Sequence, residues 1–259
     1  MNDPTLYPGC VIPSRLPFIE SAVRFIMDEL DIGIEDMQDT TCCMEPVGLM
    51  SLSLDGWFGV ASRLHSIAAG KTIVTLCDGC SVSLSECSER LQDPEGEDEA
   101  RKILAAIDRP VCVSEVRGLI EVLHDNIKLI EKRVTKRQDL ELAVFPGCHC
   151  EYVCSRKGLS ANAMMFDIVK AIGAVPRYPR ANLCCGGGLS MVDDVLSKSI
   201  LNESIASFKA TGADGVVTSC PFCFLQFDTV ARYRTYHIAE VVATAMGWEV
   251  DTAKFHRGQ

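Results

Sequence analysis

The chain has 259 residues, 47% of them hydrophobic, and its 25 Lys and Arg against 35 Asp and Glu give a formal net charge of −10. This length suits one large domain or two small ones, and the acidic surface repels nucleic-acid phosphates and anionic lipid, so we expect no nucleic-acid partner. No apolar stretch approaches the ~20 residues that a transmembrane helix needs, and the N-terminus lacks the basic and apolar parts of an export signal. The sequence therefore predicts a cytoplasmic protein without a transmembrane segment.

The predicted elements of the first half alternate between helices and strands. Residues 17–30 carry apolar side chains at helical spacing and predict a helix with one apolar face. The short apolar run 71–76 stops at Cys77 and predicts a buried parallel strand. Between the halves, the polar and acidic stretch 85–102 predicts a surface excursion, and residues 114–134 have a helical pattern.

The alternation continues in the second half. The apolar runs 140–145 and 214–219 each lead to a cysteine and predict two further strands, and residues 160–173 predict a helix with Gly173 at its end. Strands that alternate with helices form a parallel sheet, which is the α/β class. Because ligands collect outside the carboxyl ends of such strands, the cysteines that follow them are expected to converge in space.

Cysteine is the outlier of the composition. Without an export signal, many thiols favour metal binding or redox chemistry over a disulfide framework. The fourteen cysteines stand at positions 10, 42, 43, 77, 80, 87, 112, 148, 150, 154, 184, 185, 220 and 223.

Ten of these cysteines form a duplicated pattern. The first half reads C-x31-CC-x33-C-x2-C and the second reads C-x35-CC-x34-C-x2-C, and an aromatic-Pro-Gly-Cys tetrapeptide, YPGC or FPGC, opens both copies. A repeat of half the chain implies two homologous units and not a solenoid. We therefore predict two pseudo-symmetric α/β repeats, each a small parallel sheet flanked by helices with cysteine-bearing loops at the strand ends. The predicted domains are residues 1–134 and 135–259.

Several kinds of site could use such cysteines. A C-x-x-C pair alone is typical of a redox dithiol, but it does not explain the adjacent cysteines. Structural zinc needs four ligands, and each copy offers five. An iron–sulfur centre fits better, although an ordinary cubane cluster also needs only four cysteines, so the fifth suggests an unusual cluster or a spare thiol.

The glycines after the second cysteine pair have two interpretations. In CCGGG, Gly186, Gly187 and Gly188 allow positive φ angles and a close approach of the backbone to a cluster or ligand. A phosphate-binding loop is disfavoured because no Lys-Ser/Thr follows and no G-x-G-x-x-G is present. The first copy reads CCMEPVG, which predicts two similar but unequal sites, the second of them the more open.

The duplicated cysteine pattern, the YPGC and FPGC openings and CCGGG together resemble the CCG-domain family of cysteine-rich proteins, and within it most closely the B subunit of heterodisulfide reductase. The resemblance extends from about residue 4 to the segment HIAEVVATAMG near the C-terminus. It implies that each set of five cysteines binds one noncubane [4Fe-4S] cluster. The two implied ligand sets are Cys10, Cys42, Cys43, Cys77 and Cys80, and Cys148, Cys184, Cys185, Cys220 and Cys223.

The resemblance also implies a reaction and partners. The small-molecule substrate would be the coenzyme M–coenzyme B disulfide, cleaved to two thiols in one-electron steps. Electrons would come from a ferredoxin-like C subunit fed by a flavin-containing A subunit. The sequence itself contains no flavin or nicotinamide fingerprint, which requires an external electron source. The alternatives are a CCG-domain redox subunit of another complex, acting in sulfur oxidation, lactate, fumarate or succinate metabolism or aromatic-ring reduction, and a zinc-stabilised binding module.

The remaining candidates are expected to be mainly structural. Cys87 and Cys112 are predicted to be inert buried thiols, whereas Cys150 and Cys154 lie close enough to Cys148 to be considered as alternative ligands or reactive thiols. His149 could donate a proton, and Arg156 and Lys157 could help to bind an anion. For these three residues a structural histidine and a solvated basic pair are the favoured interpretations.

Overall fold

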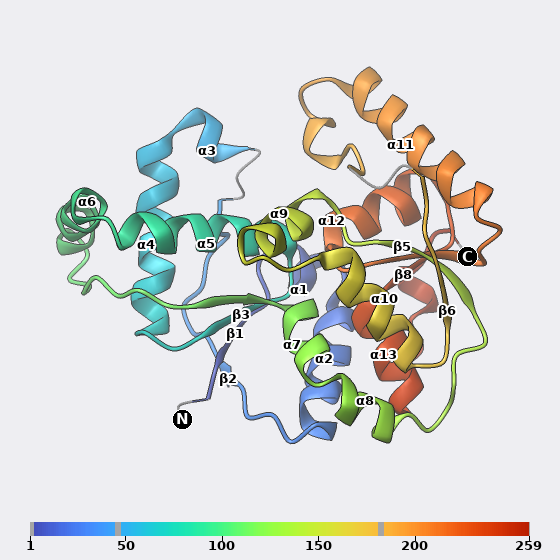
Figure 1. The fold of residues 1–259 in the computed structure, drawn as a ribbon. Helices are drawn as coiled ribbons and strands as arrows, with labels where there is room; N and C mark the ends of the chain where they lie inside the picture. The colour runs from blue at the N-terminus through green and yellow to red at the C-terminus, as the bar shows by residue number, and fades with distance from the viewer. Residues whose placement is uncertain (1–2, 45–47, 181–183, 259) are drawn as a thin grey trace. The chain divides into compact units, whose positions relative to one another are not determined.

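The computed structural model describes residues 3–44, 48–180 and 184–258, and its chain divides into two compact units (Figure 1). The first unit contains Met1–Cys10 and Gly33–Leu119, and the second contains Val11–Ile32 and Ile120–Gln259. No helix in the described part of the chain is long and apolar enough to cross a membrane.

The first unit is built on a four-stranded parallel sheet in the order β2-β1-β3-β4. Leu6 of β1 aligns with Val74 of β3, and both central strands are wholly buried, whereas the edge strand β2 is exposed. The elements are β1 (Thr5–Tyr7), β2 (Glu35–Asp36), α3 (Leu49–Leu52), α4 (Leu54–Ala68), β3 (Ile73–Thr75), α5 (Asp78–Leu91), α6 (Pro94–Ala105) and β4 (Val116–Gly118).

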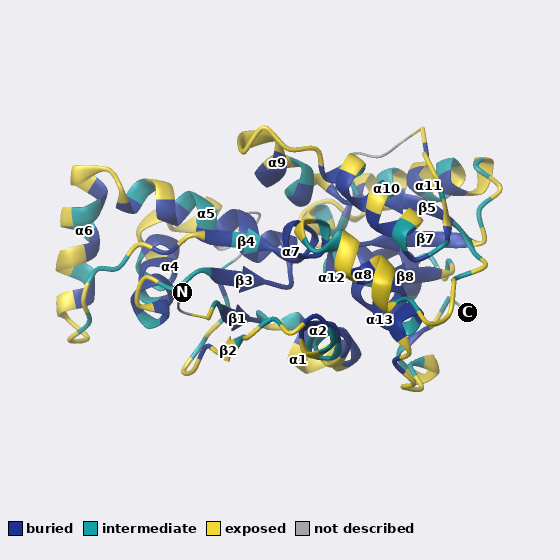
Figure 2. Ribbon diagram, turned by 60° about the horizontal axis from the view of Figure 1, so that its bottom comes forward, coloured by how far each residue is buried: buried dark blue, intermediate teal, exposed yellow. Residues whose placement is uncertain are grey.

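The second unit repeats this design with the order β6-β5-β7-β8, and Figure 2 shows its strands β5 and β7 as buried. Its strands are β5 (Glu141–Phe145), β6 (Val175–Arg177), β7 (Gly215–Thr218) and β8 (Thr235–His237). Its helices are α1 (Val11–Arg15), α2 (Pro17–Glu29), α7 (Leu119–Asp125), α8 (Ile127–Arg133), α9 (Cys148–Arg156), α10 (Ala161–Ala171), α11 (Asp194–Ala210), α12 (Pro221–Phe224) and α13 (Ile238–Met246), with the 3-10 turns η1 (Gly187–Leu189) and η3 (Ala253–Phe255) and the π-helix η2 (Leu225–Val230).

The matching strand orders confirm the predicted α/β fold with two repeats. The strands expected at 71–76, 140–145 and 214–219 are β3, β5 and β7, and the helices expected at 17–30 and 160–173 are α2 and α10. In each sheet the second strand of the unit in chain order (β2 or β6) lies on one side of the first (β1 or β5), and the third (β3 or β7) lies on the other side. The first and third strands, which are adjacent, therefore flank a topological switch point, where α/β proteins bind ligands.

The stretch 85–102, predicted as a surface excursion, lies mostly at the surface but is helical, because it forms the end of α5 and most of α6. Cys87 and Leu91 of α5 and Ala100 of α6 are buried, and Asp93 begins α6 by accepting a hydrogen bond from the backbone N–H of Glu95 (3.2 Å). Acidic side chains occupy the exposed faces of two packed helices here. The helices were not predicted because the high charge content of this stretch outweighs its few apolar positions in the sequence pattern.

The single helix predicted at 114–134 is also different in the structure. Val116 pairs with Ile73 in the sheet, so the stretch begins as strand β4 and continues as the two short helices α7 and α8. Between them, the side-chain amide of Asn126 donates to the carbonyl oxygen of Val122 at 2.9 Å. Pairing with β3 outweighs the helical pattern at the start of the stretch, because a strand completes the sheet edge.

The compact units do not follow the predicted boundary between residues 134 and 135. Helix α2, although it belongs to the first sequence repeat, lies against α13 in the second unit (Figure 1). The ring of Phe18 on α2 lies 5.6 Å from that of Phe224 and 5.4 Å from that of Phe255. The apolar face of α2 is thus buried in the second unit. The boundary at 134/135 stays a prediction about the two sequence repeats.

A buried polar cluster fastens the C-terminal segment to the second unit. The carboxylate of Asp228, on the π-helix η2, accepts hydrogen bonds from the backbone N–H groups of Arg257 and Gly258 at 2.8–3.0 Å. The carboxylate of Glu240 accepts from Thr252 Oγ1 at 2.7 Å and lies 2.9 Å from His256 Nε2. All three ionisable side chains, Asp228, Glu240 and His256, are buried.

This cluster predicts a pH-dependent contribution to stability. Burial lowers the pKa of His256, but the hydrogen bond and charge of Glu240 and the charge of Asp228 outweigh it and raise the pKa above its ordinary value. Because the folded pKa is the higher one, the stabilisation is complete below the unfolded pKa of about 6.5 and is lost as pH rises through the folded value. Glu240→Gln should therefore destabilise the protein most near pH 6.

Urea unfolding of wild type and Glu240→Gln at pH 6 and pH 8.5 measures this effect. The difference in unfolding free energy should shrink toward pH 8.5, by about 1.4 kcal/mol for each pKa unit that Glu240 contributes. A difference that is constant across this range would contradict the assignment of the charge to His256.

Candidate functional site: two groups of five cysteines

Each C-x-x-C motif lies where a central strand leads into a helix. Cys77 is the N-cap of α5 and follows β3, and Cys220 is the N-cap of α12 and follows β7. Cys80 and Cys223 lie in the first turns of the same helices. Backbone N–H groups at a helix start favour a negatively charged sulfur. Both motifs thus lie beside a switch point, but hydrogen bonds with neighbouring cysteines, together with burial, raise the pKa of Cys80 and of Cys223 well above its ordinary value.

Each aromatic-Pro-Gly-Cys turn brings the first cysteine of its set to the same place. Gly9 and Gly147 both have positive φ, +74° and +88°. A Cβ atom on Gly9 would lie 3.0 Å from Cys80 Sγ, and one on Gly147 would lie 3.2 Å from Cys223 Sγ. Glycine is favoured at both positions because φ is positive there and the turn passes close to the sulfur of the C-x-x-C motif.

In the first unit the five sulfurs follow one another in contact. Cys10 Sγ lies 3.6 Å from Cys42 Sγ, and Cys43 Sγ lies 3.2 Å from Cys80 Sγ. Hydrogen bonds also join the side chains of Cys42 and Cys43, and those of Cys80 and Cys77. The resulting order of contacts is 10–42–43–80–77, and it contains all five predicted residues.

In the second unit the corresponding sulfurs make the same contacts. Hydrogen bonds join Cys148 to Cys184, Cys184 to Cys185, Cys185 to Cys223, and Cys223 to Cys220. The order 148–184–185–223–220 is that of the first unit, position for position. The folded chain therefore gathers the ten cysteines into two groups of five with the same internal arrangement.

Within each adjacent pair of cysteines, one sulfur takes the negative charge more easily than the other. The hydrogen bond with Cys43 lowers the pKa of Cys42 to about 7, and the same bond raises the pKa of Cys43 to about 12. In the second group, hydrogen bonds from Cys148 and Cys185 hold the pKa of Cys184 well below its ordinary value, while the bond to Cys184 raises the pKa of Cys185 to about 12. The first cysteine of each adjacent pair thus favours the thiolate, the form that binds metals.

The cysteines of the two groups have the same exposure. Cys10 and Cys148 are exposed, Cys42 and Cys184 are half-buried, and the other three members of each group are buried. The expectation that the second site is the more open of the two therefore does not hold for the cysteines themselves. Both groups present one side to solvent, formed by the first two cysteines of the contact order.

The turn after each cysteine pair directs backbone N–H groups at sulfur. The N–H of Gly186 points to Cys184 Sγ at 3.3 Å and the N–H of Gly187 to Cys185 Sγ at 3.4 Å, and Gly186 has a φ of +78°. In the first unit Met44 has a φ of +55°, and its backbone hydrogen bond likewise favours the thiolate of Cys42. The two sites share one turn geometry, which Met44 adopts although it carries a Cβ. Glu45, the next residue of CCMEPVG, lies outside the described residues.

Buried serines hold these turns, and sequence reasoning missed them. In the first unit Ser83 Oγ donates to the carbonyl oxygen of Cys43 at 2.6 Å and accepts from Trp57 Nε1 at 2.8 Å. In the second, Ser204 Oγ donates to the carbonyl oxygen of Cys184 at 3.1 Å and Ser197 Oγ to that of Gly186 at 2.9 Å. The signal available in the sequence was serine at inward positions of otherwise apolar helix faces.

Tyr7 distinguishes the first site from the second, where Phe145 takes its place. The hydroxyl of Tyr7 donates a 2.6 Å hydrogen bond to the carbonyl oxygen of Thr41, the residue before Cys42. Burial, followed by the nearby cysteines, raises the pKa of Tyr7 far above its ordinary value, so the hydroxyl keeps its proton. This bond holds the segment that carries the first cysteine pair.

Tyr7→Phe should lower the free energy of unfolding by about 1 kcal/mol, the usual contribution of one such hydrogen bond. Urea unfolding, followed by the fluorescence of Trp57 in the same unit, measures the loss. Phe145→Tyr is the matched control. It introduces the hydroxyl into the second unit, where Phe145 is fully buried, and should also destabilise the protein. Equal stability of wild type and Tyr7→Phe would contradict the role of the hydroxyl.

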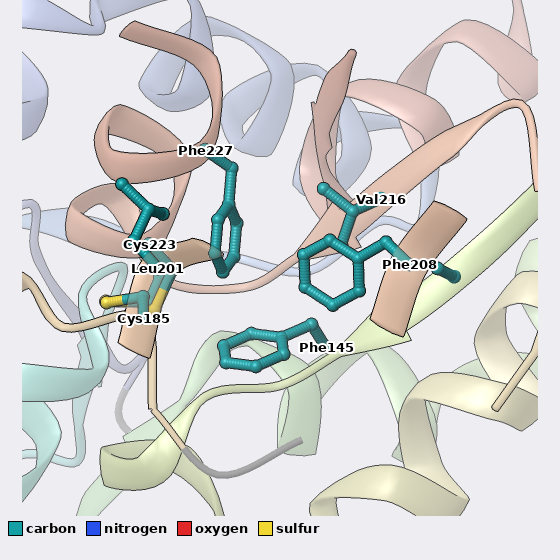
Figure 3. Packing of buried hydrophobic residues seen from close by; sticks show 9 residues of the cluster. Phe145, Cys185, Leu201, Phe208, Val216, Cys223 and Phe227 are labelled. Atoms are coloured by element: carbon teal, nitrogen blue, oxygen red, sulfur yellow. The ribbon is translucent and has the colours of Figure 1, made fainter. Parts of the chain in front are cut away.

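The second group lies on an aromatic core. The rings of Phe145, Phe208 and Phe227 pack edge to face with centroids 5.0–5.6 Å apart. Cys185, Cys220 and Cys223 belong to the same buried cluster, and Figure 3 shows Cys185 and Cys223 beside these rings. Rigid apolar packing on one side of the sulfurs keeps water away from that side.

The cysteines outside the repeat lie elsewhere. Cys87 is buried beside Ser62, and burial raises its pKa to about 12, which agrees with an inert thiol. Cys112 is half-buried, so it is less enclosed than predicted. Cys150 and Cys154 are buried on the inner face of α9. A role for these two as alternative ligands stays a prediction.

The basic residues that follow Cys148 are engaged in structural contacts. Lys157 Nζ lies 2.8 Å from both carboxylate oxygens of the buried Glu121, and the Arg156 guanidinium lies 5.6 Å from the ring centre of Tyr152. Half-buried His149 contributes a weaker electrostatic effect to the low pKa of Cys184, after the hydrogen bonds of the neighbouring cysteines. The two residues are therefore not the solvated loop pair expected from the sequence, since Arg156 ends α9 and Lys157 pairs with Glu121, and these contacts favour a structural role over anion binding.

The donor chemistry of each group fits an iron–sulfur cluster. Five thiols exceed the four ligands of structural zinc, and N–H groups directed at sulfur are the kind of hydrogen bond that tunes such clusters. In the described part of the chain, no group of three or more His, Cys, Asp or Glu side chains is arranged to bind a single metal ion. The sulfurs instead form the linear order of pairwise contacts described above.

Comparison with known proteins agrees with this arrangement. The sequence model of the cysteine-rich domain CCG matches residues 4–85 and 142–228. The B subunit of the ferredoxin/F420H2-dependent CoB-CoM heterodisulfide reductase of Methanosarcina acetivorans is 29% identical, over 95% of this chain and 90% of the relative. The 8-methylmenaquinol:fumarate reductase membrane anchor subunit of Wolinella succinogenes is 26% identical, over 93% of this chain and 91% of the relative.

Among solved structures, a hypothetical protein from Helicobacter pylori superimposes with a TM-score of 0.75 at 11% sequence identity. The match covers 98% of this chain and 51% of the other, so this chain spans about half of that protein. At this identity the likeness concerns the fold alone. The two CCG matches each contain one complete five-cysteine group, and the chain therefore belongs to the CCG cysteine-rich domain family, with two copies of the domain.

Proposed function

We propose that this chain is the catalytic iron–sulfur subunit of a heterodisulfide reductase-type complex, an oxidoreductase that reduces the coenzyme M–coenzyme B disulfide to two thiols. The observation that carries the proposal is the identical order of five sulfur contacts beside both switch points. Relatives that match nearly the whole chain and are named as the B subunit of heterodisulfide reductases support it.

Each group would hold one noncubane [4Fe-4S] cluster, as in the family. The proposed ligands are Cys10, Cys42, Cys43, Cys77 and Cys80 for the first, and Cys148, Cys184, Cys185, Cys220 and Cys223 for the second. Bound clusters would supply electrons singly to the disulfide. Cys43 and Cys185 face the buried side, so substrate would approach past the accessible Cys10 and Cys148. The thiolate products are adequate leaving groups, and the proposal assigns no general acid.

The chain would depend on partners for its electrons, because its sequence lacks flavin and nicotinamide fingerprints. We assign this role to a ferredoxin-like C subunit, itself supplied by a flavin-containing A subunit. The relatives' names, which are those of reductase subunits, support an assembly of this kind.

Anaerobic purification with iron and acid-labile sulfide analysis tests the cofactor. About eight of each per chain are expected by the family pattern, and a colourless zinc-only protein would contradict the proposal. Electron paramagnetic resonance of the oxidised protein with coenzyme M or coenzyme B tests the substrate. A new signal on thiol addition is the expected result.

A second candidate is a CCG redox subunit of another complex. The Wolinella relative, named as part of a fumarate reductase, covers this chain as fully as the methanogen relatives do. Clusters that are present in full amount but do not respond to either thiol or to the disulfide would favour this candidate.

A further inference from the structure

Four large apolar side chains stand in solvent directly after the second cysteine pair. They lie on the loop before α11 and on the first turn of that helix, the orange helix of Figure 1. We call this set the α11 patch, and its members are Met191 (95% exposed), Val192 (83%), Val195 (80%) and Leu196 (46%). Side chains of this size at these exposures present roughly 500 Å², comparable with the largest apolar patch of a typical monomer, which is often functional.

The α11 patch is held on an ordered scaffold. The backbone N–H groups of Val192 and Asp193 donate to the carbonyl oxygen of Leu189 at 2.9 and 2.8 Å. The Asp193 carboxylate then caps α11 by accepting from the N–H of Leu196 at 2.9 Å. Because backbone bonds fix this turn, its apolar side chains are displayed in a defined arrangement, which lowers the entropy cost of binding a partner.

The opposite face of α11 holds the second cysteine group. Ser197 and Ser204 point inward and fix the carbonyl groups of Gly186 and Cys184. Leu201 and Phe208 of the same face belong to the cluster that contains Cys185. One helix therefore connects the exposed α11 patch to the turn that carries two proposed cluster ligands.

Area and charge indicate what kind of occupant fits the α11 patch. An interface that buries roughly 500 Å² on each side falls below about 1,200 Å² in total, the range of electron-transfer encounters and not of obligate dimers. Asp193 and Asp194 border the α11 patch, and Lys198 pairs with Asp194 at 2.6 Å. Because Lys198 neutralises Asp194, the rim itself contributes the charge of Asp193, and it is the net charge of −10 over the whole chain that disfavours anionic lipid and favours a partner with basic residues around an apolar centre.

We infer that the α11 patch is the docking surface for the protein that delivers electrons to the second cysteine group, a reduced iron–sulfur protein with a basic rim. This inference rests on the proposed function. The cysteines of the second group would hold the centre that accepts the electron: in each encounter the carrier would lose one electron and that centre would gain it, and no covalent bond would form or break.

The test uses the double variant Val192→Asp/Val195→Asp, with Leu52→Asp as the matched control. Leu52 is also 83% exposed but lies on α3 of the first unit. The probe is the ferredoxin-like C-type subunit from the same organism, produced separately. Its binding is measured by surface plasmon resonance, and its reduction of the protein by stopped-flow absorbance, with dithionite-reduced methyl viologen as a small reductant that needs no docking.

The double variant should bind the C-type subunit at least tenfold more weakly and accept its electrons correspondingly more slowly, with unchanged reduction by methyl viologen and with Leu52→Asp like wild type. Equal binding by wild type and double variant would overturn the inference. The inference would also be overturned if the wild type forms a concentration-dependent dimer in sedimentation and the double variant does not. The same holds if the wild type floats with phosphatidylcholine–phosphatidylglycerol vesicles and the double variant does not. If the purified protein contains no iron but still binds the C-type subunit through the α11 patch, the proposed function would be rejected and the docking surface would stand.

Discussion

Cys223→Ser is expected to halve the iron content of the anaerobically purified protein, from about eight to about four atoms per chain by the family pattern. Cys223 contacts both Cys185 and Cys220, so its loss interrupts the second group near its middle. Iron and acid-labile sulfide analysis with visible absorbance measures the change. The first group should be unaffected because its five sulfurs lie in the other compact unit.

Cys80→Ser is the reciprocal variant, since Cys80 holds the same place between Cys43 and Cys77. Cys80→Ser should lose the iron of the first group and retain the half that the second group binds. The double variant Cys80→Ser/Cys223→Ser should contain almost no iron. Cys87→Ser is the control for an unrelated buried thiol, and it should retain the full amount. Loss of all iron in either single variant, with the fold intact by circular dichroism, would mean that the two groups do not bind independent clusters.

Gly186→Ala is expected to destabilise the second unit by about 3 kcal/mol or more and to remove the second cluster. A Cβ atom at this position would lie 2.5 Å from the carbonyl oxygen of Ser197, so backbone must move. The φ of +78° adds about 1–2 kcal/mol for any residue with a side chain, and movement of α11 would break the 2.9 Å bond from Ser197 Oγ. Urea unfolding followed by the fluorescence of Trp248 measures the loss.

Gly158→Ala separates backbone strain from steric clash. Gly158 has a φ of +72°, but nothing lies within 4 Å of a Cβ placed there, so this variant should lose only about 1–2 kcal/mol. A similar loss in Gly158→Ala and Gly186→Ala would show that the contact with Ser197 does not matter. Met44→Gly tests the same turn in the first unit, where relief of the strain at a φ of +55° should leave stability unchanged or raise it by up to about 1 kcal/mol.

The sequence was most informative where local chemistry repeats. The positions of β3, β5 and β7 and of helix α2 could be predicted because buried strands and amphipathic helices have short, recognisable periods. The membership of the two cysteine groups followed from duplicated spacing, and their convergence followed from the parallel sheet. The helices of 85–102 could not be predicted, because a few buried contacts there outweigh a strongly charged composition.

The sequence by itself therefore determined the cysteine sets and the α/β repeats, whereas the role of glycine in the Pro-Gly-Cys turns emerged from the φ angles of Gly9 and Gly147 in the structure. Only the tertiary structure decided that α2 completes the second unit, that Ser83, Ser197 and Ser204 hold the cysteine turns, and that Met44 adopts the conformation of Gly186. The physical reason is range: periodicity and turn chemistry act over a few residues, whereas burial and hydrogen bonding join segments that lie far apart in the chain. For the same reason, only the folded protein shows that the cysteine pairs of CCGGG and CCMEPVG are equally exposed to solvent.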